Sequence, residues 1–301
     1  MAVGADVVQI GEGEISARVA LRGAELVSWR VGGRELLWQG DPAFWPERSP
    51  VLFPVVGWTR NGEVRVAGRT YQLGLHGFAR HCDFTLAAHG PTHASLVLVD
   101  DAASRRRYPF PFRLTLHYEV AGGRLVARMA VDNVGPAAMP YAIGLHPGFA
   151  WPIGGVRPGE DVSCAQRGHR VEFSDPVPGE VPVIASGGLI SARRRRVPLD
   201  GRTLALDPSL FSRDALVFAD ANCASVRFGN ARDTLTFGFE NLPTIVLWTR
   251  AGAPFLCVEG WRGSGDPEDF TGDLDQKPGM ILLEPGATGR HAMSFSARIS
   301  G

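Results

Sequence analysis

The sequence predicts an all-β protein built as a large antiparallel β-sandwich. Apolar and polar residues alternate with a period of two along several segments, which is typical of strands with one buried face. The chain also contains 37 Gly and 22 Pro, which leave little room for long helices. Many short strands follow one another without a linker of biased composition, so we expect one domain over residues 1–301.

The clearest pair of strands lies near the middle of the chain. Apolar residues alternate with polar ones over residues 113–120, and the alternation resumes over 125–131 after Gly122 and Gly123. Two such runs joined by glycines predict a hairpin. A smaller hairpin is expected from residues 64–66 and 71–73. Further strands are expected, in chain order, at 15–21, 26–31, 94–99, 170–173, 215–219, 224–228, 234–239, 244–249, 255–259 and 291–298.

One short helix is expected at Pro42–Trp45. Asp41 can cap its first turn, and Pro42 occupies the first helical position, where a missing N–H costs nothing.

Charge and composition exclude several classes of function. The 31 basic and 31 acidic residues balance, so the chain lacks the electrostatic footprint of a protein that binds nucleic acid or an anionic membrane. The run Arg193–Arg196 is interpreted as a solvated edge. The sequence contains no stretch of about 18 apolar residues, so no membrane span is predicted. Residues 1–13 lack the pattern of a signal peptide, and we expect a cytoplasmic protein.

The four cysteines do not predict a metal site. Cys82, Cys164, Cys223 and Cys257 are scattered, without a CxxC pair, and are expected to be free thiols. The motifs of dinucleotide-binding, P-loop, zinc-protease and α/β-hydrolase proteins are also missing from the sequence.

Three polar segments beside glycines are the candidates for a functional site. They are residues 75–80 (LHGFAR), 143–149 (IGLHPGF) and 255–261 (FLCVEGW). A single histidine in such a loop is more often structural. Together, however, the segments supply two imidazoles, a carboxylate and a guanidinium, with Trp58 and Trp261 nearby as flat apolar faces. This combination suits a sugar, which presents both hydroxyl groups and an apolar C–H face.

In their order and spacing, these segments resemble the aldose 1-epimerase (galactose mutarotase-like) superfamily. Within it, the sequence is most similar to the LacX-like bacterial branch, which neighbours the hexose-6-phosphate epimerases. The resemblance covers nearly the whole chain, from residues 23–26 (GAEL) through 52–57 (LFPVVG), 76–80 (HGFAR) and 144–149 (GLHPGF) to 257–261 (CVEGW). It implies a β-supersandwich and the interconversion of α and β anomers of a hexose or hexose phosphate.

The resemblance also implies which residues are catalytic. Glu259 matches the base that removes the proton of the C1 hydroxyl, and His146 matches the acid that protonates the ring oxygen. With ordinary pKa values, Glu259 is expected to set the acidic limb of a bell-shaped pH profile and His146 the basic limb.

The substrate-binding residues implied by the resemblance are His76, Arg60, Asp214, Trp58 and Trp261. His76 is expected near the ring oxygen, and Arg60 as a two-pronged donor to hydroxyls. Asp214 matches only loosely, and Trp58 is expected to narrow the mouth of the site.

Two other functions stay open at this point. A carbohydrate-binding protein without turnover could keep the same pocket, and a glycoside hydrolase or lyase could share a related sandwich. Hydrolysis usually needs two carboxylates, and only Glu259 is identified. No metal, nucleotide or organic cofactor is implied. The expected partner is a small sugar, and whether that sugar is phosphorylated and whether the chain is a monomer or a dimer stay open.

Overall fold

The computed structural model describes residues 6–156 and 159–300. Residues 1–5, 157–158 and 301 of the predicted domain over 1–301 lie outside these ranges, and so do the first five residues of the segment 1–13 that lacks a signal-peptide pattern. In the described ranges the longest α-helix, α2 (Val162–Gln166), has five residues. The prediction of an all-β, antiparallel protein is confirmed.

A ten-stranded antiparallel sheet forms the base of the structure. The predicted central hairpin is formed by β10 (Phe112–Ala121) and β11 (Arg124–Asn133), with Phe112 opposite Asn133. In spatial order the sheet contains β18 (Leu199–Asp200), β19 (Thr203–Ala205), β15 (Arg170–Phe173), β21 (Ser225–Gly229), β22 (Thr234–Glu240), β26 (Thr288–Arg298), β11 (Arg124–Asn133), β10 (Phe112–Ala121), β9 (His93–Val99) and β8 (Thr85–His89).

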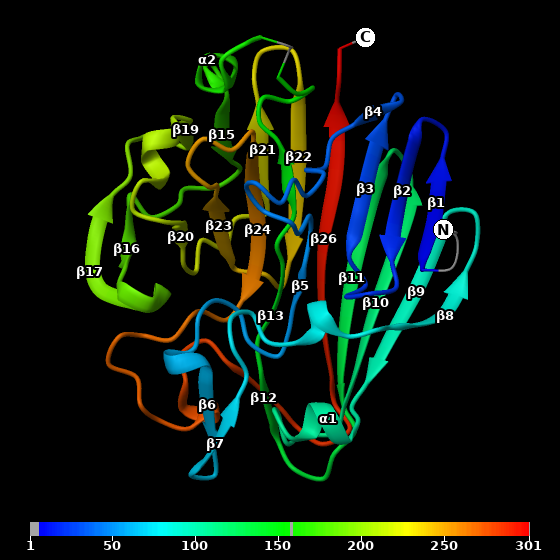
Figure 1. Ribbon diagram of the computed structural model, residues 1–301, viewed down its shortest axis with the longest axis vertical. Helices are drawn as coiled ribbons and strands as arrows, with labels where there is room; N and C mark the ends of the chain where they lie inside the picture. The colour runs from blue at the N-terminus through cyan, green and yellow to red at the C-terminus, as the bar shows by residue number, and fades with distance from the viewer. Residues whose placement is uncertain (1–5, 157–158, 301) are drawn as a thin grey trace.

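Two smaller sheets cover one face of this base. The first contains β1 (Val7–Glu12), β2 (Ile15–Ala20), β3 (Leu26–Val31) and β4 (Arg34–Glu35), and it packs on β10 and β11 (Figure 1). The second contains β20 (Leu216–Phe218), β23 (Thr244–Trp248), β24 (Phe255–Arg262), β13 (Ile143–Leu145) and β5 (Val51–Leu52), with β14 (Gly148–Ala150) also paired to β24.

The core lies where the three sheets meet. Trp29 of β3, Phe149 of β14 and Phe295 of β26 are fully or almost fully buried, and their ring centroids lie 5.8–6.1 Å apart. Phe149 also packs on Phe237 of β22 at 4.6 Å. These aromatic contacts fix the sheet that contains β24 against the base, and so give the candidate site a rigid floor.

The remaining elements are short hairpins and single turns. The predicted small hairpin is formed by β6 and β7. The bounds are β6 (Glu63–Val66), β7 (Arg69–Gln72), β12 (Met139–Tyr141), β25 (Ile281–Leu283), β16 (Glu180–Ile184), β17 (Ile190–Arg196), α1 (Ala102–Arg105) and the 3₁₀ turns Arg60–Gly62, Ala79–His81, Ser186–Gly188, Pro208–Phe211 and Leu274–Gln276.

Each of the ten further strands expected from the sequence overlaps an observed strand. The helix expected at Pro42–Trp45 is wrong. The backbone N–H groups of Phe44 and Trp45 both donate to the Asp41 carbonyl, which closes a single turn and no helix. Pro46 explains the difference, because a residue that precedes proline is pushed out of the helical region. No helix in the described residues has the length and hydropathy of a membrane span.

Candidate active site

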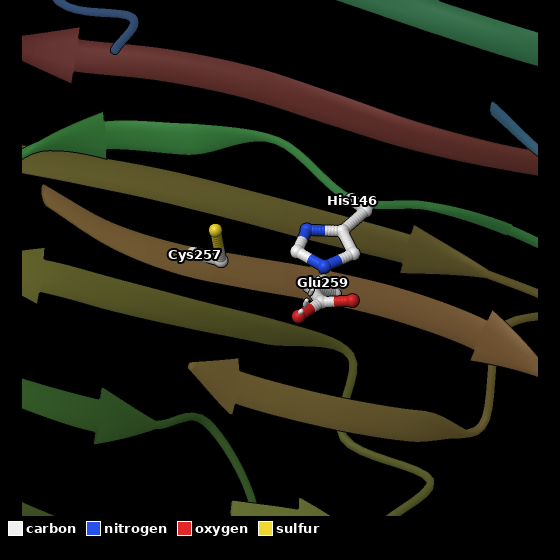
Figure 2. A group of neighbouring side chains, drawn as sticks. All are labelled: His146, Cys257 and Glu259. Carbon is white, nitrogen blue, oxygen red and sulfur yellow. Dashed lines mark ion pairs between the residues drawn. The ribbon is translucent and has the colours of Figure 1, made fainter. Parts of the chain in front are cut away.

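Strand pairing brings His146 over Glu259. β24 lies inside its sheet, with β23 on one side and β13 and β14 on the other. Leu145 at the end of β13 pairs with Gly260, and Gly148 at the start of β14 pairs with Cys257. His146 lies in the short connection between β13 and β14, so its side chain faces this stretch of β24 (Figure 2). Its Nε2 lies 3.5 Å from Oε1 of Glu259.

The Glu259 side chain is held by a neighbour on its own strand, Trp261. Side chains alternate along a strand, so Glu259 and Trp261 share one face of β24. The Trp261 indole N–H donates to Oε2 of Glu259 at 2.9 Å. Glu259 is only 1% exposed, and burial raises the pKa of its carboxyl well above the usual range, while the hydrogen bond from Trp261 opposes that rise.

His146 lies in an aromatic cage. Its ring is tilted by 31° from that of Trp45, with centroids 4.9 Å apart, and it makes a T-shaped contact with Trp248, with centroids 5.7 Å apart. Burial, with a smaller contribution from the nearby Arg80 charge, lowers the pKa of His146 to about 3. Among the described residues, the buried Nδ1 atom of His146 has no hydrogen-bond partner.

The two pKa shifts have opposite directions, because burial disfavours the charged form of each group. When the pair holds a single proton, burial favours the form with that proton on Glu259 and with His146 neutral. Transfer of the single proton to His146 gives an ion pair without changing the net charge of the site.

His76 is fixed as a hydrogen-bond donor to the cavity. The Gly57 N–H donates to its Nδ1 at 3.0 Å, so in the neutral ring the proton is on Nε2. Burial and the nearby His146 and Arg80 hold the pKa of His76 well below its usual value. The local chain requires Gly77, because its φ is +72° and an added Cβ would lie 2.2 Å from the Phe53 carbonyl oxygen.

These groups line one cavity of about 440 Å³, which is within the range of small-molecule sites. Trp58 is 45% exposed, and Asp214 is exposed with its carboxylate accepting from the Ala215 N–H at 2.7 Å. The residues expected from the sequence that line the cavity are Trp58, His76, His146, Asp214, Glu259 and Trp261.

Arg60 does not lie in this cavity, which corrects the expectation that it contacts the sugar there. Its guanidinium donates to the carbonyl oxygens of Glu268 and Phe270, and its backbone N–H donates to Asp266 at 2.8 Å. These partners hold Arg60 in a separate cavity of about 220 Å³. The guanidinium in the candidate site is that of Arg80, whose Nη1 pairs with Glu47 at 2.9 Å.

Three aromatic or charged residues that line the cavity were not indicated by the sequence. Trp45 and Glu47 flank Pro46 in an irregular segment, where no periodicity indicates which way a side chain points. Trp248 could have been found. It pairs with Cys257 across the β23–β24 hairpin and shares a face with Val246, which pairs with Glu259.

The chain is similar over most of its length to proteins of one known family. Residues 6–296 match the family model described as aldose 1-epimerase. The chromosomal LacX protein of Lactococcus lactis subsp. lactis is 30% identical over 264 residues, which cover 84% of this chain and 86% of that protein.

Solved structures show the same fold. A galactose mutarotase related enzyme from Lactobacillus acidophilus has a TM-score of 0.87 and 28% identity, with 97% of each chain covered. A galactose mutarotase-like protein from Lactobacillus casei has a TM-score of 0.88 at 24% identity, with 97% of this chain and 99% of that chain covered. Because residues 6–296 of its 301 residues match the family model, this chain belongs to the aldose 1-epimerase family.

Proposed function

We propose that the protein interconverts the α and β anomers of an aldose by general acid–base catalysis. The observation that carries the proposal is the pair His146–Glu259, with Nε2 and Oε1 3.5 Å apart in the wall of a sugar-sized cavity. Ring opening requires removal of the C1 hydroxyl proton and protonation of the ring oxygen, and these two oxygens share one carbon. An acid and a base must therefore act side by side.

Glu259 acts as the base and His146 as the acid. The reactive form is the carboxylate with the imidazolium, and it is reached when the shared proton moves from Glu259 to His146. The Trp261 N–H stabilises the carboxylate, and the face of Trp45 stabilises the imidazolium. After rotation about the C1–C2 bond, the roles reverse and the ring closes as the other anomer.

His76 and Arg80 orient the sugar. The Nε2–H of His76 is available to a sugar oxygen because Nδ1 is occupied by Gly57. Arg80 and Glu47 together offer a donor and an acceptor to neighbouring hydroxyls. Trp58 supplies an apolar face at the mouth of the cavity.

The charges in the cavity favour an uncharged sugar over a sugar phosphate. Among the described residues that line it, Arg80 is the one with a permanent positive charge, and Glu47 already pairs with it. Glu47, Asp214 and Glu259 supply three carboxyl groups. A phosphate dianion would meet more negative than positive charge at this site.

Polarimetry and exchange NMR on a panel of aldoses and their 6-phosphates test the proposal. We expect catalysed anomerisation of at least one free aldose. The methyl glycosides of the same sugars should stay unchanged, because they have no C1 hydroxyl proton to remove. Binding of an aldose without turnover would favour the carbohydrate-binding alternative, and release of methanol from a methyl glycoside would favour hydrolysis.

A further inference from the structure

Cys257 belongs to a buried group of three side chains that the proposed reaction does not fully use. One nitrogen of His146, the sulfur of Cys257 and one carboxylate oxygen of Glu259 lie within 4.8 Å of one another. The grouping follows from the strands, because Cys257 and Glu259 are two residues apart on one face of β24. Cys257 itself is fully buried and does not line the cavity.

The two ring nitrogens of His146 have different surroundings. Figure 2 shows one ring nitrogen beside the Glu259 carboxylate and the other on the side where the Cys257 sulfur lies. The His146 side chain is 9% exposed, and its Nδ1 has no partner among the described residues. A metal ion shared with Glu259 would bind Nε2, which lies 3.5 Å from Oε1 of that carboxylate.

The donor set and its spacing suit Zn²⁺. Imidazole nitrogen, thiolate sulfur and carboxylate oxygen are its common protein ligands, at about 2.0–2.3 Å, which places neighbouring ligands of a tetrahedron about 3.3–3.8 Å apart. The Nε2–Oε1 distance of 3.5 Å already fits. The three ligand atoms lie within 4.8 Å of one another, so a side-chain movement of about 1 Å would bring all of them to the spacing of a tetrahedral site.

Charge balance favours the same ion. A thiolate and a carboxylate neutralise a divalent cation, so the buried complex carries no net charge. The charge of Arg80 acts on His146, and Glu47 pairs with Arg80 and offsets that charge. Burial raises the pKa of the Cys257 thiol, so binding must displace its proton into the solvent.

We propose that His146, Cys257 and Glu259 form a Zn²⁺ site, and that the bound ion is a reversible inhibitor of the protein. The ion takes the nitrogen and oxygen atoms that transfer protons, and its fourth position faces the cavity. The inhibition rests on the proposed function, whereas the binding does not. Mg²⁺ and Ca²⁺ should not compete, because they avoid thiolate ligands.

Binding is tested without reference to activity. Titration of the metal-free protein with Co²⁺ should give the visible absorption of a tetrahedral site with a thiolate-to-cobalt charge-transfer band, and added Zn²⁺ should remove both. Cys257→Ala should lose the charge-transfer band and at least tenfold in Zn²⁺ affinity against a chromophoric chelator. Cys164→Ala removes an exposed thiol and serves as the matched control, with affinity unchanged.

Inhibition is tested by polarimetry on the sugar that the protein anomerises fastest. Stoichiometric Zn²⁺ should stop the wild-type reaction, and EDTA should restore it. The Cys257→Ala variant should keep the basal rate and should need at least tenfold more Zn²⁺ for half inhibition. If the alanine substitution disturbs folding, the Cys257→Ser variant is used in its place. Equal Zn²⁺ affinity of wild type and both variants, or a cobalt spectrum without the charge-transfer band, overturns the site. Tight Zn²⁺ binding that leaves the anomerisation rate unchanged overturns the inhibition alone. If the protein has no epimerase activity, the proposed function fails, and the cobalt titration still decides whether the Zn²⁺ site exists.

Discussion

The indole N–H of Trp261 donates to the Glu259 carboxylate at 2.9 Å. The sequence indicated Trp261 as an apolar face for the sugar, and the structure makes it a polar partner of the proposed base as well. Two residues apart on one strand, the pair is preformed by the alternation of side chains and does not depend on a mobile loop.

Trp261→Phe keeps an aromatic ring and removes this donor. A hydrogen bond to a carboxylate stabilises its charged form, so its loss should raise the pKa of Glu259 further. We expect kcat to fall about tenfold, with KM changed much less, and the limb of the pH–rate profile that Glu259 sets to move to higher pH. An unchanged profile with a raised KM would mean that Trp261 acts only as an apolar surface.

Glu259→Gln should stabilise the fold at neutral pH. The pKa of Glu259 is raised in the folded state, so its stability contribution is complete below its unfolded pKa of about 4.3 and declines as the pH rises. The amide removes that decline, which amounts to at most about 1.4 kcal/mol per pH unit. Thermal unfolding of both proteins from pH 4 to pH 8 should show a Tm difference that grows with pH. A constant difference would argue against a raised pKa.

Glu47→Gln should make the site more tolerant of a phosphorylated sugar. The substitution keeps the shape of the side chain but leaves the Arg80 guanidinium without its ion-pair partner at 2.9 Å. We expect the ratio of kcat/KM for a 6-phosphate to that for the free sugar to rise about tenfold. Glu240→Gln, at an exposed position outside the cavity, is the control. A ratio that does not change would show that the Arg80–Glu47 pair does not select against phosphate.

Gly188→Ala should weaken sugar binding by displacing Trp58. An alanine Cβ at Gly188 would lie 1.9 Å from Cδ1 of the Trp58 ring, so the indole must leave its position at the mouth of the cavity. We expect KM to rise several-fold with kcat nearly unchanged. Trp58→Ala should have the same effect, and the double variant should be no worse than either single one.

Gly187→Ala is the matched control for that prediction. Its φ of +73° is close to the +75° of Gly188, so the backbone strain is similar, but an added Cβ meets nothing within 4 Å. If both alanine variants raise KM equally, then loop strain is responsible and contact with Trp58 is not.

The sequence predicted the strands well because alternation reports burial on one face. β10 and β11 bury alternate residues, and the pattern is visible in the sequence without knowledge of the fold. Glu259 and Trp261 were found for the same reason, since both lie on the continuous strand β24. The small hairpin β6–β7 was also within reach, because its turn is short.

Arg60 and Arg80 show where this reasoning ends. Both follow glycine-containing loops, and nothing in the local sequence distinguishes a guanidinium that faces the cavity from one that binds backbone carbonyls. The difference depends on Glu47, Glu268 and Phe270, which are distant in sequence from the arginines they contact. The pKa shifts of His146 and Glu259 were equally out of reach, because burial by Trp45 and Trp248 appears only once the sheets are packed.

The mutarotation rate of Glu259→Gln is the most direct test of the central claim that Glu259 and His146 transfer the protons of anomerisation. The amide keeps the size of the side chain and can hydrogen-bond, but it cannot accept the C1 hydroxyl proton. On a sugar that the wild type anomerises, we expect exchange NMR to show a loss of about 10²–10⁴-fold in kcat with sugar binding retained. His146→Asn should lose a similar factor, and the double variant should lose less than the product of the two. A Glu259→Gln protein that keeps the wild-type rate would contradict the account.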